Sequence, residues 1–160
     1  MLETLLPGVQ HLQNIHPLVV HFPIAFLTGA ALFYFLTWIF RKEVLSITAL
    51  FVLILGAISG VVALGTGLYA EPGVMVSFSV RENLLNPHKQ LMFITMGLSI
   101  AITIWALISP PFPKKGRPIF LLLFLVLLAA MILGADYGAR MVYDYNAGGS
   151  ACPQPIDFTK

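Results

Sequence analysis

Four long apolar stretches, separated by short polar segments, dominate the pattern along the chain. They cover about residues 17–40, 44–69, 88–109 and 118–135. Each is long enough to cross a hydrocarbon core of roughly 30 Å, which takes about 20 helical residues. The strands of a membrane barrel are far shorter and alternate apolar with polar residues. The pattern therefore predicts four membrane-spanning α-helices.

Composition agrees with this pattern. Hydrophobic residues make up 58% of the chain and charged residues only 10%, and the mean hydropathy is +0.89. Soluble domains have roughly 25% charged residues. A chain of 160 residues has room for one bundle core. We predict an all-α fold, an integral membrane four-helix bundle that forms a single domain over residues 1–160.

The basic residues predict the orientation of the bundle. Two short connections, RKE at 41–43 and PPFPKKGRP at 110–118, hold five Lys or Arg residues. The positive-inside rule assigns these connections to the cytoplasm. We therefore expect an N-out/C-out protein of the bacterial inner membrane, with an external loop at 70–87 and an external tail at 136–160. The N-terminal segment has no basic region typical of a signal peptide, so we expect the first span to be retained.

All four histidines fall at the predicted outer face. They are His11, His16, His21 and His88. Ionisable groups at membrane depth usually mark a cofactor, a proton path or a buried partner. His16 and His21 are five residues apart, so a regular helix directs them to different faces and does not let them chelate one ion.

His21 and His88 are the predicted pair of ligands. His21 lies about one turn inside the first span, and Ala25, Thr28 and Gly29 follow on its face as a shallow trough. His88 follows Asn86 and Pro87, which we interpret as the N-cap and first turn of the third span. Two imidazoles from two helices of a bundle form a six-coordinate haem b site, which favours electron transfer. The sequence predicts one haem, or two if His11 and His16 pair elsewhere.

Other polar residues near this face are candidates for supporting roles. Arg140 or Lys89 would neutralise haem propionates, although Arg140 also has a simpler interpretation as the i, i+4 partner of Asp136. Tyr137, with Tyr143 and Tyr145, fits an interfacial aromatic belt. These tyrosines are also possible hydrogen-bond donors to a propionate or a quinone carbonyl.

Two further patterns carry structural expectations. The second stretch has small residues at helical spacing, which favours close packing or makes room for a macrocycle; these residues are Gly56, Ser59, Gly60, Ala63 and Gly67. The segment VMVSFSV at 74–80 alternates in polarity, which predicts a short extended segment across the mouth of the bundle.

The chain resembles the bacterial membrane-protein family known as domain of unknown function 2231. The resemblance rests on HPLVVHFPIA (16–25), GLY (67–69), NPHK (86–89) and GARMVYDYNAG (138–148), and it covers nearly the whole chain. It implies a four-helix membrane unit. Because related chains are joined to Rieske or cytochrome c modules, it also implies respiratory electron transfer. The acidic residue that usually follows the glycine-leucine pair is replaced here by Tyr69-Ala70.

These observations lead to one main functional hypothesis and two alternatives. The main one is a haem b subunit of a respiratory or photosynthetic complex, which exchanges electrons with quinol and with a c-type cytochrome or Rieske protein. The first alternative is a non-redox accessory or assembly subunit that contacts lipid and other membrane subunits. The second is a copper or zinc site built from the histidines, with Cys152 or Met92.

Catalysis by the chain alone has the least support. The sequence contains no nucleophile with a base at a recognisable spacing and no phosphate-binding glycine loop. The net charge of +2 comes from the connections that set topology, so we expect no nucleic-acid partner. We therefore expect an electron-transfer or accessory subunit without catalytic residues.

Overall fold

The computed structural model describes residues 15–147. Over this range the chain forms four long helical spans, each long and apolar enough to cross a membrane. The predicted all-α four-helix fold is confirmed. The helices are α2 (His16–Val19), α3 (His21–Phe40), α4 (Glu43–Ala70), η2 (Glu71–Gly73), α5 (Phe78–Val80), η3 (Arg81–Leu85), α6 (Asn86–Ile108) and α7 (Arg117–Tyr145).

The first span consists of α2 and α3, which meet at Val20. Pro23 has no backbone N–H, so it cannot continue the hydrogen-bond ladder back to the carbonyl of Val19. The span ends at Arg41, which adopts a left-handed conformation with φ 54°. Its N–H donates to the carbonyl of Thr37 at 2.8 Å, which satisfies one of the orphan carbonyls at the helix end.

The segment between the second and third spans is more helical than the sequence suggested. The expected extended segment at 74–80 is wrong over its last three residues, because Phe78–Val80 is helical and continues through η3 into α6. Asn86 is therefore not an N-cap, and Pro87 lies inside a continuous helical run. The π-helical turn of η3 lies directly before this proline, where the regular hydrogen-bond ladder must be interrupted in any case.

The last helix also extends beyond its expected boundary. α7 continues to Tyr145, so the first ten residues of the predicted tail are helical. Asn146 ends the helix in a left-handed conformation with φ 52°, a conformation that asparagine tolerates better than most residues.

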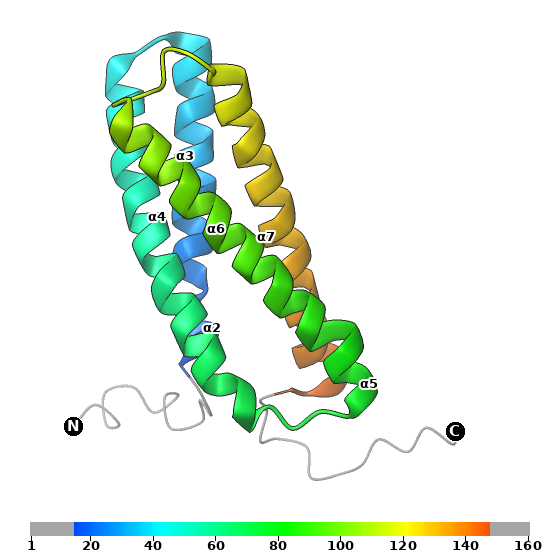
Figure 1. Cartoon of the computed structure of the whole chain (residues 1–160). Helices are drawn as coiled ribbons and strands as arrows, with labels where there is room; N and C mark the ends of the chain where they lie inside the picture. Colours follow the sequence, from blue (N-terminus) through cyan, green and yellow to red (C-terminus); the bar gives the residue numbers. More distant parts are fainter. Residues whose placement is uncertain (1–14, 148–160) are drawn as a thin grey trace, which may run out of the picture.

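The four spans form two antiparallel hairpins, α3 with α4 and α6 with α7 (Figure 1). α4 also packs against α6, and α3 packs against α7. α4 and α6 lie close together near the short connections and separate toward the opposite end (Figure 1). The described chain begins and ends at that opposite end.

The largest buried side chains of the core form an aromatic cluster near the short connections. Tyr34, Phe120 and Phe124 are fully buried. Tyr34 contacts both phenylalanine rings at centroid distances of 5.0 and 5.5 Å, and its hydroxyl donates to the carbonyl of Pro111 at 3.2 Å. This contact joins α3 to the connection between α6 and α7.

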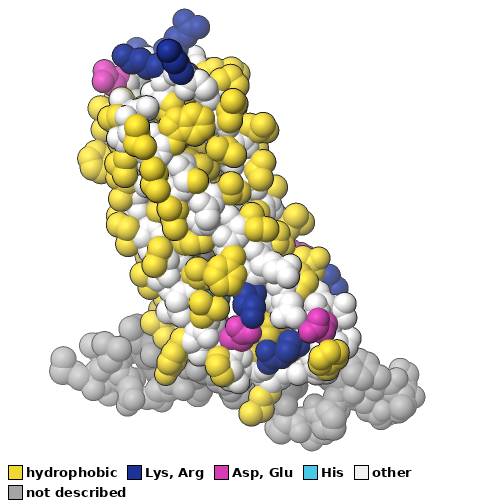
Figure 2. All heavy atoms as spheres, in the orientation of Figure 1, with side chains coloured by type: hydrophobic (Ala, Val, Ile, Leu, Met, Phe, Trp, Pro, Cys, Tyr) yellow, Lys and Arg dark blue, Asp and Glu magenta, His cyan; other side chains and the backbone are white. Residues whose placement is uncertain are grey.

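Most of the outer surface between the two ends is hydrophobic, and the charged side chains lie near the ends (Figure 2). Large apolar residues such as Leu32, Phe51, Ile104 and Leu122 are more than half exposed. In water such a surface would be costly, whereas lipid chains solvate it. The chain is therefore a multi-pass membrane protein in its structure as well as in its composition.

Candidate functional site

His16 is held against α4 near the wider end of the bundle. Its ring is half-buried, and its Nδ1 lies 3.1 Å from the Thr66 hydroxyl oxygen. The Thr66 hydroxyl donates its only hydrogen to the carbonyl of Ala63 at 2.9 Å. The tautomer with its hydrogen on Nδ1 fits this arrangement, and in that neutral form the ring carries its lone pair on Nε2.

A glycine makes room for this ring. A Cβ atom at Gly67 would lie only 2.9 Å from Cε1 of His16, which is closer than real side chains approach. The small residues of α4 therefore serve packing, as expected: Gly67 contacts an imidazole, and Gly56 and Gly60 face Leu27 and Met96.

His88 has a similar environment in the second hairpin. Its Nδ1 lies 2.6 Å from the carbonyl oxygen of Gly134 on α7. A carbonyl only accepts, so Nδ1–H of His88 is the donor and Nε2 carries the lone pair in the neutral ring. A Cβ atom at Gly138 would lie 3.1 Å from Cε1 of this ring, so the second imidazole also packs directly on a glycine.

The structure places His16 and His88 in equivalent positions, each ring packed inside its own hairpin. Each histidine lies on the first helix of its hairpin, and each packs on a glycine near the end of the second helix. The two rings are close enough to interact electrostatically. With Nδ1 hydrogen-bonded and Nε2 carrying the lone pair, both rings have the arrangement typical of histidines that ligate a metal.

His21 lies elsewhere. It is exposed on α3, and Ala25 and Thr28 on the same face are exposed as well. The predicted trough below His21 therefore faces the outside of the bundle. The buried face of α3 is instead the one that carries Pro23, Leu27 and Tyr34. The ring that interacts with His88 belongs to His16, for which we predicted only a secondary role.

Lys89 is part of a small ionic cluster beside His88. Its Nζ lies 2.7 Å from Oε1 of Glu71, and Nη1 of Arg81 lies 3.8 Å from the same oxygen. Arg81 also donates to the carbonyl of Val74 at 3.3 Å. The cluster joins the end of the second span to the start of the third. Sequence reasoning missed Arg81 and Glu71, because no motif links residues whose proximity depends on helix packing.

Arg140 has a different partner from the expected one. Its Nε lies 3.8 Å from Oδ2 of Asp144, and both side chains are about half exposed. The expected partner was Asp136. Tyr137 packs against a small buried cluster of Val80, Leu84, Leu85 and Met141. Tyr143 is 86% exposed, which suits an interfacial position.

Two of the proposed ligands, His11 and Cys152, lie outside the described residues. Within residues 15–147, no three His, Cys, Asp or Glu side chains come together as a metal-binding group. Met92, another proposed ligand, contacts Gly134 with its terminal methyl group.

The fold and the site define a class: a multi-pass membrane protein whose described residues form four spans, with one imidazole packed inside each hairpin. The family model described as predicted membrane protein (DUF2231) matches residues 12–151. The chain belongs to this family, as its sequence motifs indicated. No curated protein and no solved structure matches the chain.

Proposed function

We propose that the protein is a haem b electron-transfer subunit of a bacterial inner-membrane redox complex, in which His16 and His88 would hold the haem. The observation that supports this proposal is the matched environment of the two rings. Each donates from Nδ1 to a fixed oxygen and has its lone pair on Nε2, the atom that would bind iron. His88 keeps its predicted role, and His16 takes the role first assigned to His21.

The surroundings of the rings fit such a group. The rings come from different hairpins, and Gly67 and Gly138 let the helix backbones approach the imidazoles closely. When bound, haem would supply a one-electron Fe(III)/Fe(II) couple, and two histidine ligands leave no open iron position. The chain's own contribution is to hold both imidazoles by hydrogen bonds at Nδ1 and by packing on glycine.

Basic side chains at this end fit the needs of haem propionates. Lys89 directly follows His88 in the sequence, and Arg81 shares its carboxylate partner, so the cluster of two cations and one anion has a net positive charge. A cation beside a propionate forms a charge-assisted hydrogen bond. Arg140 is a third, more exposed cation at this end.

The charge distribution supports an orientation with the histidine end in the periplasm. The opposite end carries the basic connections, which the positive-inside rule assigns to the cytoplasm. A c-type cytochrome or Rieske protein would then exchange electrons at the histidine end, with quinol as the membrane-soluble partner.

A spectrum of the purified full-length protein tests the proposal. We expect a reduced-minus-oxidised haem b spectrum that is lost in His16→Ala and in His88→Ala. His21→Ala is the matched control, because it removes an exposed imidazole from the same span and should keep the spectrum. If the haem b spectrum were lost in His21→Ala but retained in His16→Ala, the ligands would be His21 and His88, the pair predicted from the sequence. A colourless protein from haem-replete cells would refute haem binding.

The hydrogen bonds of the two histidines also support a second function, that of a non-redox accessory subunit. Bonds from His16 to Thr66 and from His88 to Gly134 join helices, as structural polar residues do in membrane bundles. In this case the protein would be colourless, and His16→Ala and His88→Ala would lower its stability or its assembly with partner subunits. Co-purification of the parent complex from variant strains measures this effect.

A further inference from the structure

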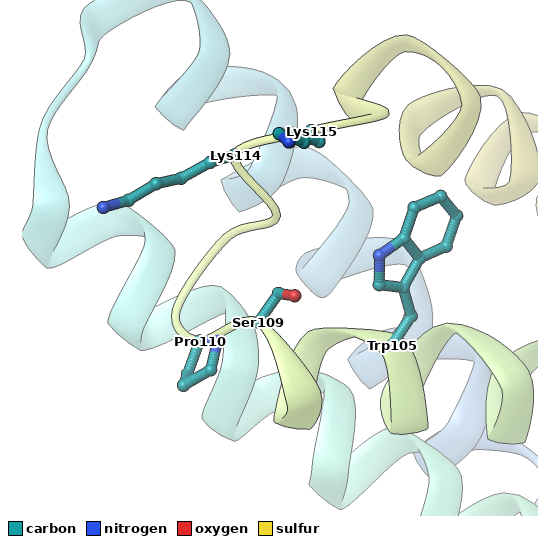
Figure 3. Close-up of a pocket in the computed structure, with 5 residues that line it drawn as sticks. All are labelled: Trp105, Ser109, Pro110, Lys114 and Lys115. Atoms are coloured by element: carbon teal, nitrogen blue, oxygen red, sulfur yellow. The ribbon is translucent and has the colours of Figure 1, made fainter.

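The end of the bundle opposite the histidines contains a separate cavity. It has a volume of about 540 Å³ and is lined by Trp105, Ser109, Pro110, Lys114 and Lys115. Its walls come from the end of α6 and from the connection to α7, which arches over Ser109 and Trp105 (Figure 3). The volume is within the range of about 300–1,000 Å³ that is typical of small-molecule sites.

The lining combines an apolar wall with polar groups suited to an anion. The Trp105 ring is fixed from the side, because it packs edge-on against Phe120 with centroids 5.6 Å apart. Ser109 offers a hydroxyl, and Figure 3 shows Lys114 and Lys115 on the arching connection above it, with the Lys114 side chain extending away from Ser109 and Trp105. Lysine binds phosphate as a point charge, and tryptophan favours the boundary between apolar and wet surroundings.

The charge around the cavity is strongly positive. Among the described residues at this end, the basic side chains are Arg41, Lys42, Lys114, Lys115 and Arg117, and the one acid is Glu43. Arg117 is already engaged, because its Nε donates to the carbonyl of Pro113 at 2.9 Å and its guanidinium lies 5.0 Å from the centre of the Phe112 ring. Lys114 and Lys115 are the cations that line the cavity.

We infer that this cavity binds a phosphate group, with Lys115 and, after rotation of its exposed side chain, Lys114 as the charged contacts, Ser109 as a hydrogen-bond donor and Trp105 as the apolar wall. Its position at the boundary of the apolar surface gives access to the headgroup of an anionic lipid. A soluble phosphate has the same chemistry and reaches the cavity from the aqueous side. The site lies at the opposite end from the histidines and does not depend on haem binding.

Native mass spectrometry of the full-length protein in detergent tests this inference. Phosphatidylglycerol, phosphatidylcholine and inorganic phosphate are the three probes. Lys114→Gln/Lys115→Gln should weaken binding of the preferred anionic probe by about tenfold. The matched control, Arg41→Gln/Lys42→Gln, removes the same charge from the same end through the other connection, and it should change binding by no more than about twofold. Lys114→Arg/Lys115→Arg keeps the charge and should retain binding.

The outcomes separate the two sources of phosphate. Lysine-dependent binding of phosphatidylglycerol, without comparable binding of inorganic phosphate, identifies a lipid site. Lysine-dependent binding of inorganic phosphate without the lipid identifies a soluble ligand. If the two glutamine double variants lost binding of the anionic probe equally, the binding would reflect general charge attraction, and the inference would be overturned. Unchanged binding in Lys114→Gln/Lys115→Gln, or no binding of either anionic probe to the wild type, would also overturn it.

Discussion

The two ends of the bundle are built in different ways. Near the basic connections, large aromatic rings fill the space between helices, and Phe120 alone contacts Tyr34, Trp105, Phe112 and Phe124. Near the histidines, the imidazoles pack on glycines and threonine beside a smaller apolar cluster around Leu84 and Met141, and α4 and α6 separate (Figure 1). Dense packing at one end fixes the four helices. The other end can therefore accommodate polar side chains such as the two imidazoles.

We expect the largest loss of stability from a substitution in the aromatic cluster near the basic connections. Phe120→Ala removes a fully buried ring and should lower the free energy of unfolding by about 3–5 kcal/mol, because the surrounding rings cannot close the cavity. Phe93→Ala is the control, since this ring is 48% exposed on the outside of α6. Unfolding titrations in micelles measure both variants. Similar losses in the two variants would contradict the assignment of the core to this end.

A smaller effect is expected where the histidine rings pack on glycine. Gly67→Ala should displace the His16 ring and cost about 1–3 kcal/mol, as overpacking does. Gly65→Ala, two residues earlier on α4, meets no atom within 4 Å. Gly65→Ala should therefore raise the free energy of unfolding by up to about 1 kcal/mol, because alanine favours helix more than glycine does. If both substitutions had the same sign, the close contact between Gly67 and His16 would be refuted.

The ionic cluster provides the smallest effect. Glu71→Gln removes the carboxylate shared by Lys89 and Arg81, and it should lower the free energy of unfolding by about 1 kcal/mol, the upper range for partly exposed ion pairs. Asp144→Asn removes the exposed partner of Arg140 and should cost less than about 0.5 kcal/mol. High salt should reduce the difference between the two variants, because it screens exposed charges. If the difference persisted in high salt, Glu71 would stabilise the protein by an interaction other than its partly exposed ion pairs.

The sequence determined the fold class because its signal is local and repeated. Four apolar stretches of sufficient length dictate four helices, since backbone polar groups in lipid must be satisfied within each segment. The same local rules located the small residues of the second span, and the family motifs identified the region around His16 and His88. The predicted helix boundaries were less accurate where a proline such as Pro87 lies inside a helix rather than at its start.

Only the tertiary structure decided which polar residues meet. His16 and His21 are neighbours on one span, and nothing in their spacing indicates which ring faces the bundle. The choice follows from burial of the face with Leu27 and Tyr34, which turns His21 outward and His16 toward α4. The contacts of Glu71 with Lys89, and of His88 with Gly134, likewise depend on how the hairpins pack. A linear pattern specifies which face of a helix is apolar, but the partner of each side chain is set by the neighbouring helices.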